Sequence, residues 1–205
     1  MAMIPDLENH FRGLIPPRRE LLQRLEEEAA RERIPIVGPV VGELLGILAM
    51  AMGARTILEL GTATGYSTIY LAQAAAALGG QVISLEWQPD MAARARDNLA
   101  TAGLAANARV LLGEAQTLMA DLSGPFDLAF LDIDKEGYLP ALPHIHHLLR
   151  LGGLLVADNT GFQGAAAFNL ALRQDQRWRS VHLLTFLPQH SPEHDGLALA
   201  VKTAD

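Results

Sequence analysis

The sequence contains no cysteine, which excludes disulfides and thiol chemistry and is typical of a cytoplasmic protein. It lacks an excess of basic residues: the formal net charge is -7, which argues against nucleic acid as a partner. The first twenty residues lack the apolar core of a signal peptide. The longest apolar stretch, 40–54, is interrupted by Glu43 and is too short to span a bilayer comfortably. We therefore expect a soluble, cytoplasmic protein with no membrane partner.

Two nucleotide-binding motifs are also missing. The dinucleotide pattern G-x-G-x-x-G is broken by Ala63 and Ser67, which disfavours an NAD-dependent oxidoreductase. No P-loop lysine is present, which disfavours ATP-type phosphate binding. The chain has instead the spacing G-x-x-x-G at Gly61 and Gly65.

The chain length of 205 residues and the 50% hydrophobic content suit a single domain, with N-terminal helices in 1–53 and an α/β core in 54–205. Continuous apolar runs alternate with helical segments, which predicts a doubly wound, mostly parallel, Rossmann-like sheet covered on both faces. The last two runs have no helix between them, so we expect an antiparallel strand at the edge of the sheet. We predict seven strands, at 55–60, 81–86, 108–113, 126–132, 153–158, 179–187 and 196–202, and helices at 17–33, 39–53, 67–78, 89–103, 115–122 and 140–150.

Ligands of an open doubly wound sheet bind beyond the carboxyl ends of its strands. Gly61 and Gly65 follow the first strand and would let the backbone approach a ligand closely, although a tight turn alone also explains them. Glu86 ends the second strand, where a carboxylate can accept both hydroxyls of a ribose or simply be solvated. Glycine turn and carboxylate together indicate a nucleoside ligand.

Six segments occur in a familiar order: ILELGTATGYS, ISLEW, GEAQ, FLDIDKEGY, LLVADN and DGLALAVK. They resemble the cation-dependent class I O-methyltransferases related to the catechol and caffeoyl-coenzyme A enzymes, over about residues 35–203. The resemblance implies S-adenosylmethionine as the cofactor. The positions it implies for cofactor binding are Glu59, Gly61, Thr62, Gly65, Tyr66, Ser67, Glu86, Trp87, Ala115, Gln116 and Asp132.

The same resemblance implies a metal site. Asp132, Asp158 and Asn159 are hard oxygen ligands at adjacent strand ends, a set that suits Mg²⁺, or Mn²⁺ and Ca²⁺ less selectively. An aspartate that caps a helix beside an Asp-Asn turn is the alternative. Lys135 is the expected general base, with Asp132 as its catalytic companion, because a nearby cation disfavours the ammonium form. A surface ion pair of Lys135 with Asp134 or Glu136 is the competing interpretation.

Several other side chains receive minor interpretations. Tyr138 is expected to pack in the core, and the histidines at 144, 146 and 147 to lie on the surface. His190 and His194 could reach the acceptor or a metal, but loop histidines beside prolines are more often solvated. Glu193 is a candidate for the acidic residue that contacts the acceptor in the catechol enzymes. The short segment after Asn159 predicts an open acceptor site, or one completed by the N-terminal segment or another subunit.

The function expected from this sequence is O-methylation of a small vicinal dihydroxy aromatic, the phenolic acceptor, whose phenolate attacks the sulfonium methyl. A metal-independent methyltransferase and a nucleoside-binding module without catalysis are the alternatives. The nearly uniformly apolar segment 39–53 suggests a homodimer, although a helix that covers one face of the sheet would look the same.

Overall fold

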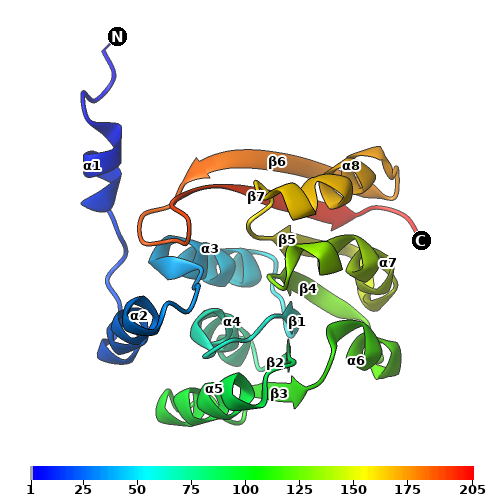
Figure 1. The fold of residues 1–205 in the computed structure, drawn as a ribbon. Helices are drawn as coiled ribbons and strands as arrows, with labels where there is room; N and C mark the ends of the chain where they lie inside the picture. Colours follow the sequence, from blue (N-terminus) through cyan, green and yellow to red (C-terminus); the bar gives the residue numbers. More distant parts are fainter. Residues whose placement is uncertain (1) are drawn as a thin grey trace.

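The computed structural model describes residues 2–205, which form one seven-stranded sheet flanked by helices (Figure 1). The strand order is β3-β2-β1-β4-β5-β7-β6. β1 to β5 are parallel, and β7 runs antiparallel to both β5 and β6, so the reversed strand lies one position inside the edge. The predicted fold class is confirmed. The strands are β1 (Thr56–Leu60), β2 (Gln81–Glu86), β3 (Ala108–Leu112), β4 (Phe126–Leu131), β5 (Leu149–Ala157), β6 (Trp178–Phe186) and β7 (His194–Lys202).

Helices cover both faces of the sheet and enclose two apolar cores. Within β1, Ile57 packs into one core and Leu58 into the other, and both side chains are fully buried. This alternation explains why the strands are continuous apolar runs. The first core is covered by α3 (Gly38–Ala51), α4 (Tyr66–Ala77) and α5 (Pro89–Thr101), and the second by α6 (Ala115–Asp121), α7 (Tyr138–Leu148) and α8 (Ala166–Gln174).

The remaining helices are α1 (Leu7–Arg12), α2 (Glu20–Glu32) and the 3-10 turns η1 (Lys135–Gly137) and η2 (Gln163–Ala165). We did not predict α1, which stands away from the sheet in Figure 1 and buries no residue. Its six residues are too few to show a helical period, and its start is set by Asp6, which accepts a hydrogen bond from the Asn9 N–H at 3.0 Å.

The structure bears on the predictions for α3 and α7. On α3, Ile47 and Met50 are each 51% exposed, and the homodimer suggested for this segment stays a prediction. α7 ends at Leu148 rather than at 150, because β5 already begins at Leu149, which pairs with Phe126, and not at 153 as predicted. Across residues 2–205, no helix combines the length and apolarity that crossing a membrane requires.

Candidate active site

The carboxyl ends of β1 to β5 open into one cavity of about 730 Å³. Residues 33–37 and part of the loop between β6 and β7 complete its wall, so part of the N-terminal segment lines this cavity. Most predicted site residues line the cavity; they are Gly61, Thr62, Tyr66, Ser67, Glu86, Trp87, Ala115, Gln116, Asp132, Lys135, Asp158 and Asn159. Glu59 and Gly65 are not part of the lining.

The glycine turn after β1 has a steric requirement at Gly61. Its φ is +97°, and a Cβ there would lie 1.9 Å from the carbonyl oxygen of Asp132. The ends of β1 and β4 therefore approach each other so closely that a side chain does not fit. Gly65, with φ of +86°, precedes the first turn of α4 and contributes to the geometry of the turn rather than to the cavity wall.

Glu59 lies beneath the turn rather than in the cavity. Its carboxylate is fully buried and accepts hydrogen bonds from the hydroxyls of Ser67 at 2.6 Å, Ser84 and Thr68. Thr62 hydrogen-bonds Ser84 in the same network. Burial raises the pKa of Glu59 to about 7, although the three hydroxyl donors oppose this shift. Glu59 therefore positions Ser67 from below.

The raised pKa of Glu59 predicts a pH dependence of stability. Between 4.5 and about 7 the folded protein holds a proton that the unfolded chain has released. This contribution to stability is complete below 4.5 and is lost as the pH rises through about 7. It amounts to roughly 3 kcal/mol. We expect denaturant titrations of the ligand-free protein from about pH 5 to about pH 9 to show this fall, and Glu59→Gln to remove most of it. If the unfolding free energy of Glu59→Gln fell with pH as steeply as that of the unaltered protein, the pH dependence would come from another group.

The end of β2 presents a second carboxylate to the cavity. Glu86 is 5% exposed and accepts hydrogen bonds from the backbone N–H groups of Ala63 and Gln88, both at 2.8 Å. The first of these bonds joins β2 to the glycine turn, so the carboxylate is fixed at the cavity wall. The next residue, Trp87, is 57% exposed and lines the cavity.

Lys135 is held at the end of β4 by three acceptors. Its Nζ donates to Asp132 Oδ1 and the carbonyl of Ile133, both at 2.9 Å, and to the Tyr138 hydroxyl at 3.0 Å. The ion-pair partner is thus Asp132, not Asp134 or Glu136. Tyr138 is fully buried as expected, but its hydroxyl also donates to the carbonyl of Asp158 at 2.9 Å. The core tyrosine therefore connects the ends of β4 and β5, a role that the sequence analysis missed.

His190 is 6% exposed and lines the cavity, so the solvated one of its two interpretations is wrong. Its Nε2 lies 2.8 Å from Asp158 Oδ2, and its Nδ1 contacts the carbonyl of Pro192. Burial lowers the pKa of His190, but the hydrogen bond and charge of Asp158 outweigh it and the net shift is upward. Burial raises the pKa of Asp158, and together with the charge of Asp132 it outweighs the hydrogen bond from His190, which lowers that pKa. Both shifts favour a proton held between His190 and Asp158.

The three expected metal ligands line the same cavity. Among the described residues, no group of three or more His, Cys, Asp or Glu side chains is arranged to hold a metal. The predicted set has two carboxylates, Asp132 and Asp158, and one amide, Asn159, and all three line the cavity. The Asn159 oxygen accepts no hydrogen bond within 2–205. Two mutually repelling carboxylates and a free amide oxygen have the donor chemistry that suits a hard cation.

Three other side chains lie outside the cavity wall. Glu193 binds Arg12 through both oxygens, at 2.5 and 2.6 Å, so it does not supply the acidic acceptor contact for which it was a candidate. His194 is exposed, as expected, and contacts Glu8. His146 is 7% exposed and contacts the carbonyl of Ala204, which corrects its assignment to the surface.

This sheet order, with a glycine turn after β1 and a carboxylate after β2, is a Rossmann-like architecture that solved O-methyltransferase structures share. The O-methyltransferase family model matches residues 16–188. The chain belongs to this O-methyltransferase family, and it is an enzyme of that class.

Named relatives and solved structures agree with this assignment. A catechol O-methyltransferase of Niastella koreensis is 36% identical over 183 residues, 80% of this chain and 81% of that protein. The catechol O-methyltransferase of Mycobacterium tuberculosis is 44% identical over 119 residues, 58% of this chain and 54% of that protein. The O-methyltransferase TomG of Streptomyces achromogenes, solved in complex with SAM, superimposes with a TM-score of 0.86 at 28% identity and covers 97% of this chain and 96% of its own.

Proposed function

We propose that the protein transfers the methyl group of S-adenosylmethionine to one hydroxyl of a vicinal dihydroxy aromatic, with the help of a divalent cation. One observation carries the proposal: Asp132, Lys135, Asp158 and Asn159 share one cavity wall at the ends of β4 and β5. The same cavity contains the glycine turn and Glu86, which are the features expected of a nucleoside site. The names of the similar enzymes support this substrate class.

The cofactor would occupy the side of the cavity formed by β1, β2 and the start of α6. Glu86 offers its carboxylate to the ribose hydroxyls, and Ser67, held by Glu59, lies at the start of α4. Ala115 and Gln116 belong to the first turn of α6 and would border the adenine, with Trp87 at its face. S-adenosylmethionine supplies the activated methyl group, and the protein supplies its orientation.

The cation would be held by Asp132, Asp158 and Asn159, with Mg²⁺ as the best match and Mn²⁺ or Ca²⁺ as alternatives. Bound there, it would lower the pKa of a phenolic hydroxyl and favour acceptors with two adjacent oxygens. Lys135 carries the sole side-chain amine among the described residues that line the cavity. Its Nζ is therefore the group that we assign to accept the phenolic proton.

Turnover is expected to depend on the cation and on neighbouring hydroxyls. We expect labelled methyl transfer to catechol to stop with excess chelator and to return with Mg²⁺. Resorcinol, whose hydroxyls are not adjacent, is the matched control and should be a far poorer acceptor because it cannot present two oxygens to one ion. Transfer to catechol that is indifferent to chelator would contradict the cation site and favour a metal-independent methyltransferase.

A further inference from the structure

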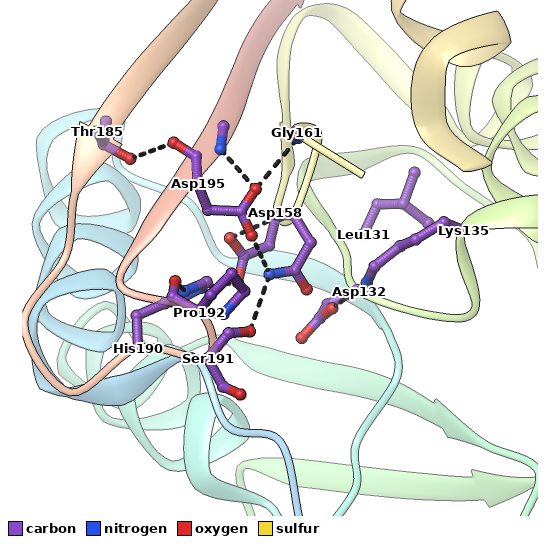
Figure 2. Close-up of polar contacts among 12 residues, drawn as sticks. Leu131, Asp132, Lys135, Asp158, Gly161, Thr185, His190, Ser191, Pro192 and Asp195 are labelled. Atoms are coloured by element: carbon purple, nitrogen blue, oxygen red, sulfur yellow. Dashed lines mark hydrogen bonds and ion pairs between the residues drawn. The ribbon is translucent and has the colours of Figure 1, made fainter. Parts of the chain in front are cut away.

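Asp195 is a buried carboxylate that lies behind the cavity wall and that none of the roles above uses. It stands near the start of β7, in the DGLALAVK segment, and is 3% exposed. Its Oδ1 accepts hydrogen bonds from the backbone N–H groups of Gly196 at 2.6 Å and Gly161 at 3.1 Å. Its Oδ2 accepts one from Asn159 Nδ2 at 2.6 Å. Figure 2 shows the carboxylate directed toward the turn that carries Gly161.

These contacts determine which way the Asn159 amide is turned. The Nδ2 group faces Asp195 Oδ2 and, at 3.4 Å, the carbonyl of Ser191. Both of these groups only accept hydrogen bonds, so only the NH₂ end of the amide satisfies them. The oxygen end is thereby turned away from Asp195 and accepts no hydrogen bond from residues 2–205.

The turn around Asp195 is built for this contact. A Cβ at Gly161 would lie 2.7 Å from Asp195 Oδ1, and a Cβ at Gly196 would lie 2.6 Å from Thr160 Oγ1. Glycine at both positions lets the two backbone N–H groups reach the carboxylate. Asn159 itself has φ of +47°, a left-handed conformation that asparagine tolerates better than most residues. The backbone thus holds Asp195, and Asp195 holds the amide.

We propose that Asp195 is a positioning residue that keeps the Asn159 oxygen toward the cavity and so makes Asn159 a cation ligand. This inference rests on the proposed cation site. An amide that is free to rotate would also present its NH₂ group, which repels a cation and donates no electron pair to it. The carboxylate supplies the preference for one orientation because an NH₂ group bonded to a charged acceptor is stabilised more than one bonded to water.

The near-isosteric substitution Asp195→Asn tests the orientation directly. The two backbone N–H groups of Gly161 and Gly196 would retain the oxygen of the new side chain, which leaves its NH₂ facing residue 159. Asn159 would then have to turn its own oxygen toward that NH₂ group and its NH₂ group toward the cavity. The variant therefore reverses the orientation of the Asn159 amide. It keeps the size of side chain 195 and the hydrogen bonds from the N–H groups of Gly161 and Gly196.

A second substitution should restore the site. In the double variant Asn159→Asp with Asp195→Asn, the new carboxylate accepts from the new NH₂ group and still presents an oxygen to the cavity. In Asn159→Asp alone, the new carboxylate would face the carboxylate of Asp195. The atoms that face each other there, Asn159 Nδ2 and Asp195 Oδ2, are 2.6 Å apart, so the two negative charges would repel and disturb the site. A role of Asp195 in stability alone does not predict rescue by this exchange.

The experiment is titration of Mn²⁺ into the S-adenosylhomocysteine-bound protein, followed by calorimetry and by the electron paramagnetic resonance signal of free Mn²⁺. We expect Asp195→Asn to weaken Mn²⁺ binding by about 10- to 100-fold and the double variant to recover most of it, with S-adenosylhomocysteine affinity unchanged. Equal Mn²⁺ affinity of Asp195→Asn and the unaltered protein would overturn the inference alone. Absence of Mn²⁺ binding by the unaltered protein would overturn the cation site and this inference together.

Folding of the variants does not limit the test. Thermal unfolding of each variant shows whether it is folded before its affinity is compared. If Asp195→Asn does not fold, the comparison of Asn159→Asp with the double variant decides, because both keep a carboxylate as the ligand. Tighter Mn²⁺ binding by the double variant than by Asn159→Asp supports the inference, and equal binding contradicts it.

Discussion

Lys135→Met will lower the rate of methyl transfer by about 100- to 10,000-fold, the range that a general base contributes. The substitution keeps a long flexible side chain and removes the amine that lies 2.9 Å from Asp132 and 3.0 Å from the Tyr138 hydroxyl. Binding of S-adenosylhomocysteine should change little, because Lys135 is placed at the ends of β4 and β5 rather than beside the glycine turn. Initial rates with saturating catechol and calorimetry of the cofactor product separate the two effects.

The matched control for this prediction is Arg33→Met. Arg33 is the other Lys or Arg residue in the cavity lining, and its side chain makes no hydrogen bond or ion pair among the described residues. Loss of its charge should alter the rate far less than loss of Lys135. A Lys135→Met enzyme that keeps more than about a tenth of the rate would exclude Lys135 as the base.

Gly61→Ala will both destabilise the protein and impair cofactor binding. The added Cβ would overlap the Asp132 carbonyl, at 1.9 Å, in a residue whose φ is +97°. Left-handed strain and overpacking each cost about 1–3 kcal/mol, so we expect a loss of roughly 2–6 kcal/mol in the free energy of unfolding. Because relief of the overlap must separate the ends of β1 and β4, we also expect S-adenosylhomocysteine affinity to fall at least about tenfold.

Gly53→Ala is the control for Gly61→Ala. Gly53 also has a positive φ, +68°, but a Cβ there would meet nothing within 4 Å. This control isolates backbone strain, which should cost about 1 kcal/mol without any effect on cofactor affinity. Denaturant unfolding and calorimetry on both variants measure the two quantities. Equal losses in both variants would show that the close approach of β1 to β4 is unimportant.

The sheet was predictable because its strands carry a strong local signal. Strands such as β4 are covered on both faces of the sheet, so nearly all of their side chains are buried and apolar. The missing helix before the last strand also indicated that β7 reverses direction. α1 was not predictable in this way, because a six-residue helix with no buried side chain has no period to detect. Its position depends on contacts with a loop about 180 residues away, through Arg12 and Glu193.

The site was predictable where its residues follow strands directly. Asp132, Lys135, Asp158 and Asn159 share a rim because parallel strands end at the same edge. The burial of Glu59 was not predicted, although the alternation of side chains along β1 indicates it. Leu58 and Leu60 both face the second core, so Glu59, which lies between them, points to the opposite face of the sheet.

The contacts that His190 and Asp195 make were not predicted, for a different reason. Their partners, Asp158 and Asn159, lie more than thirty residues earlier, on a neighbouring strand end. A contact between residues so far apart in the sequence produces no local sequence pattern. The aspartate before glycine at the start of the last strand was the available signal, and we used it only as part of a resemblance.

The position of β7 has a consequence for the order of assembly. β7 comes last in sequence among the seven strands of this sheet, yet it lies between β5 and β6 and joins them. During synthesis, β6 has no neighbour in the sheet until residues 194–202 have left the ribosome. Asp195 belongs to this same strand, so Asn159 acquires its hydrogen-bond partner at the same moment. The wall that carries Asn159 is thus completed only when β7 has joined the sheet between β5 and β6.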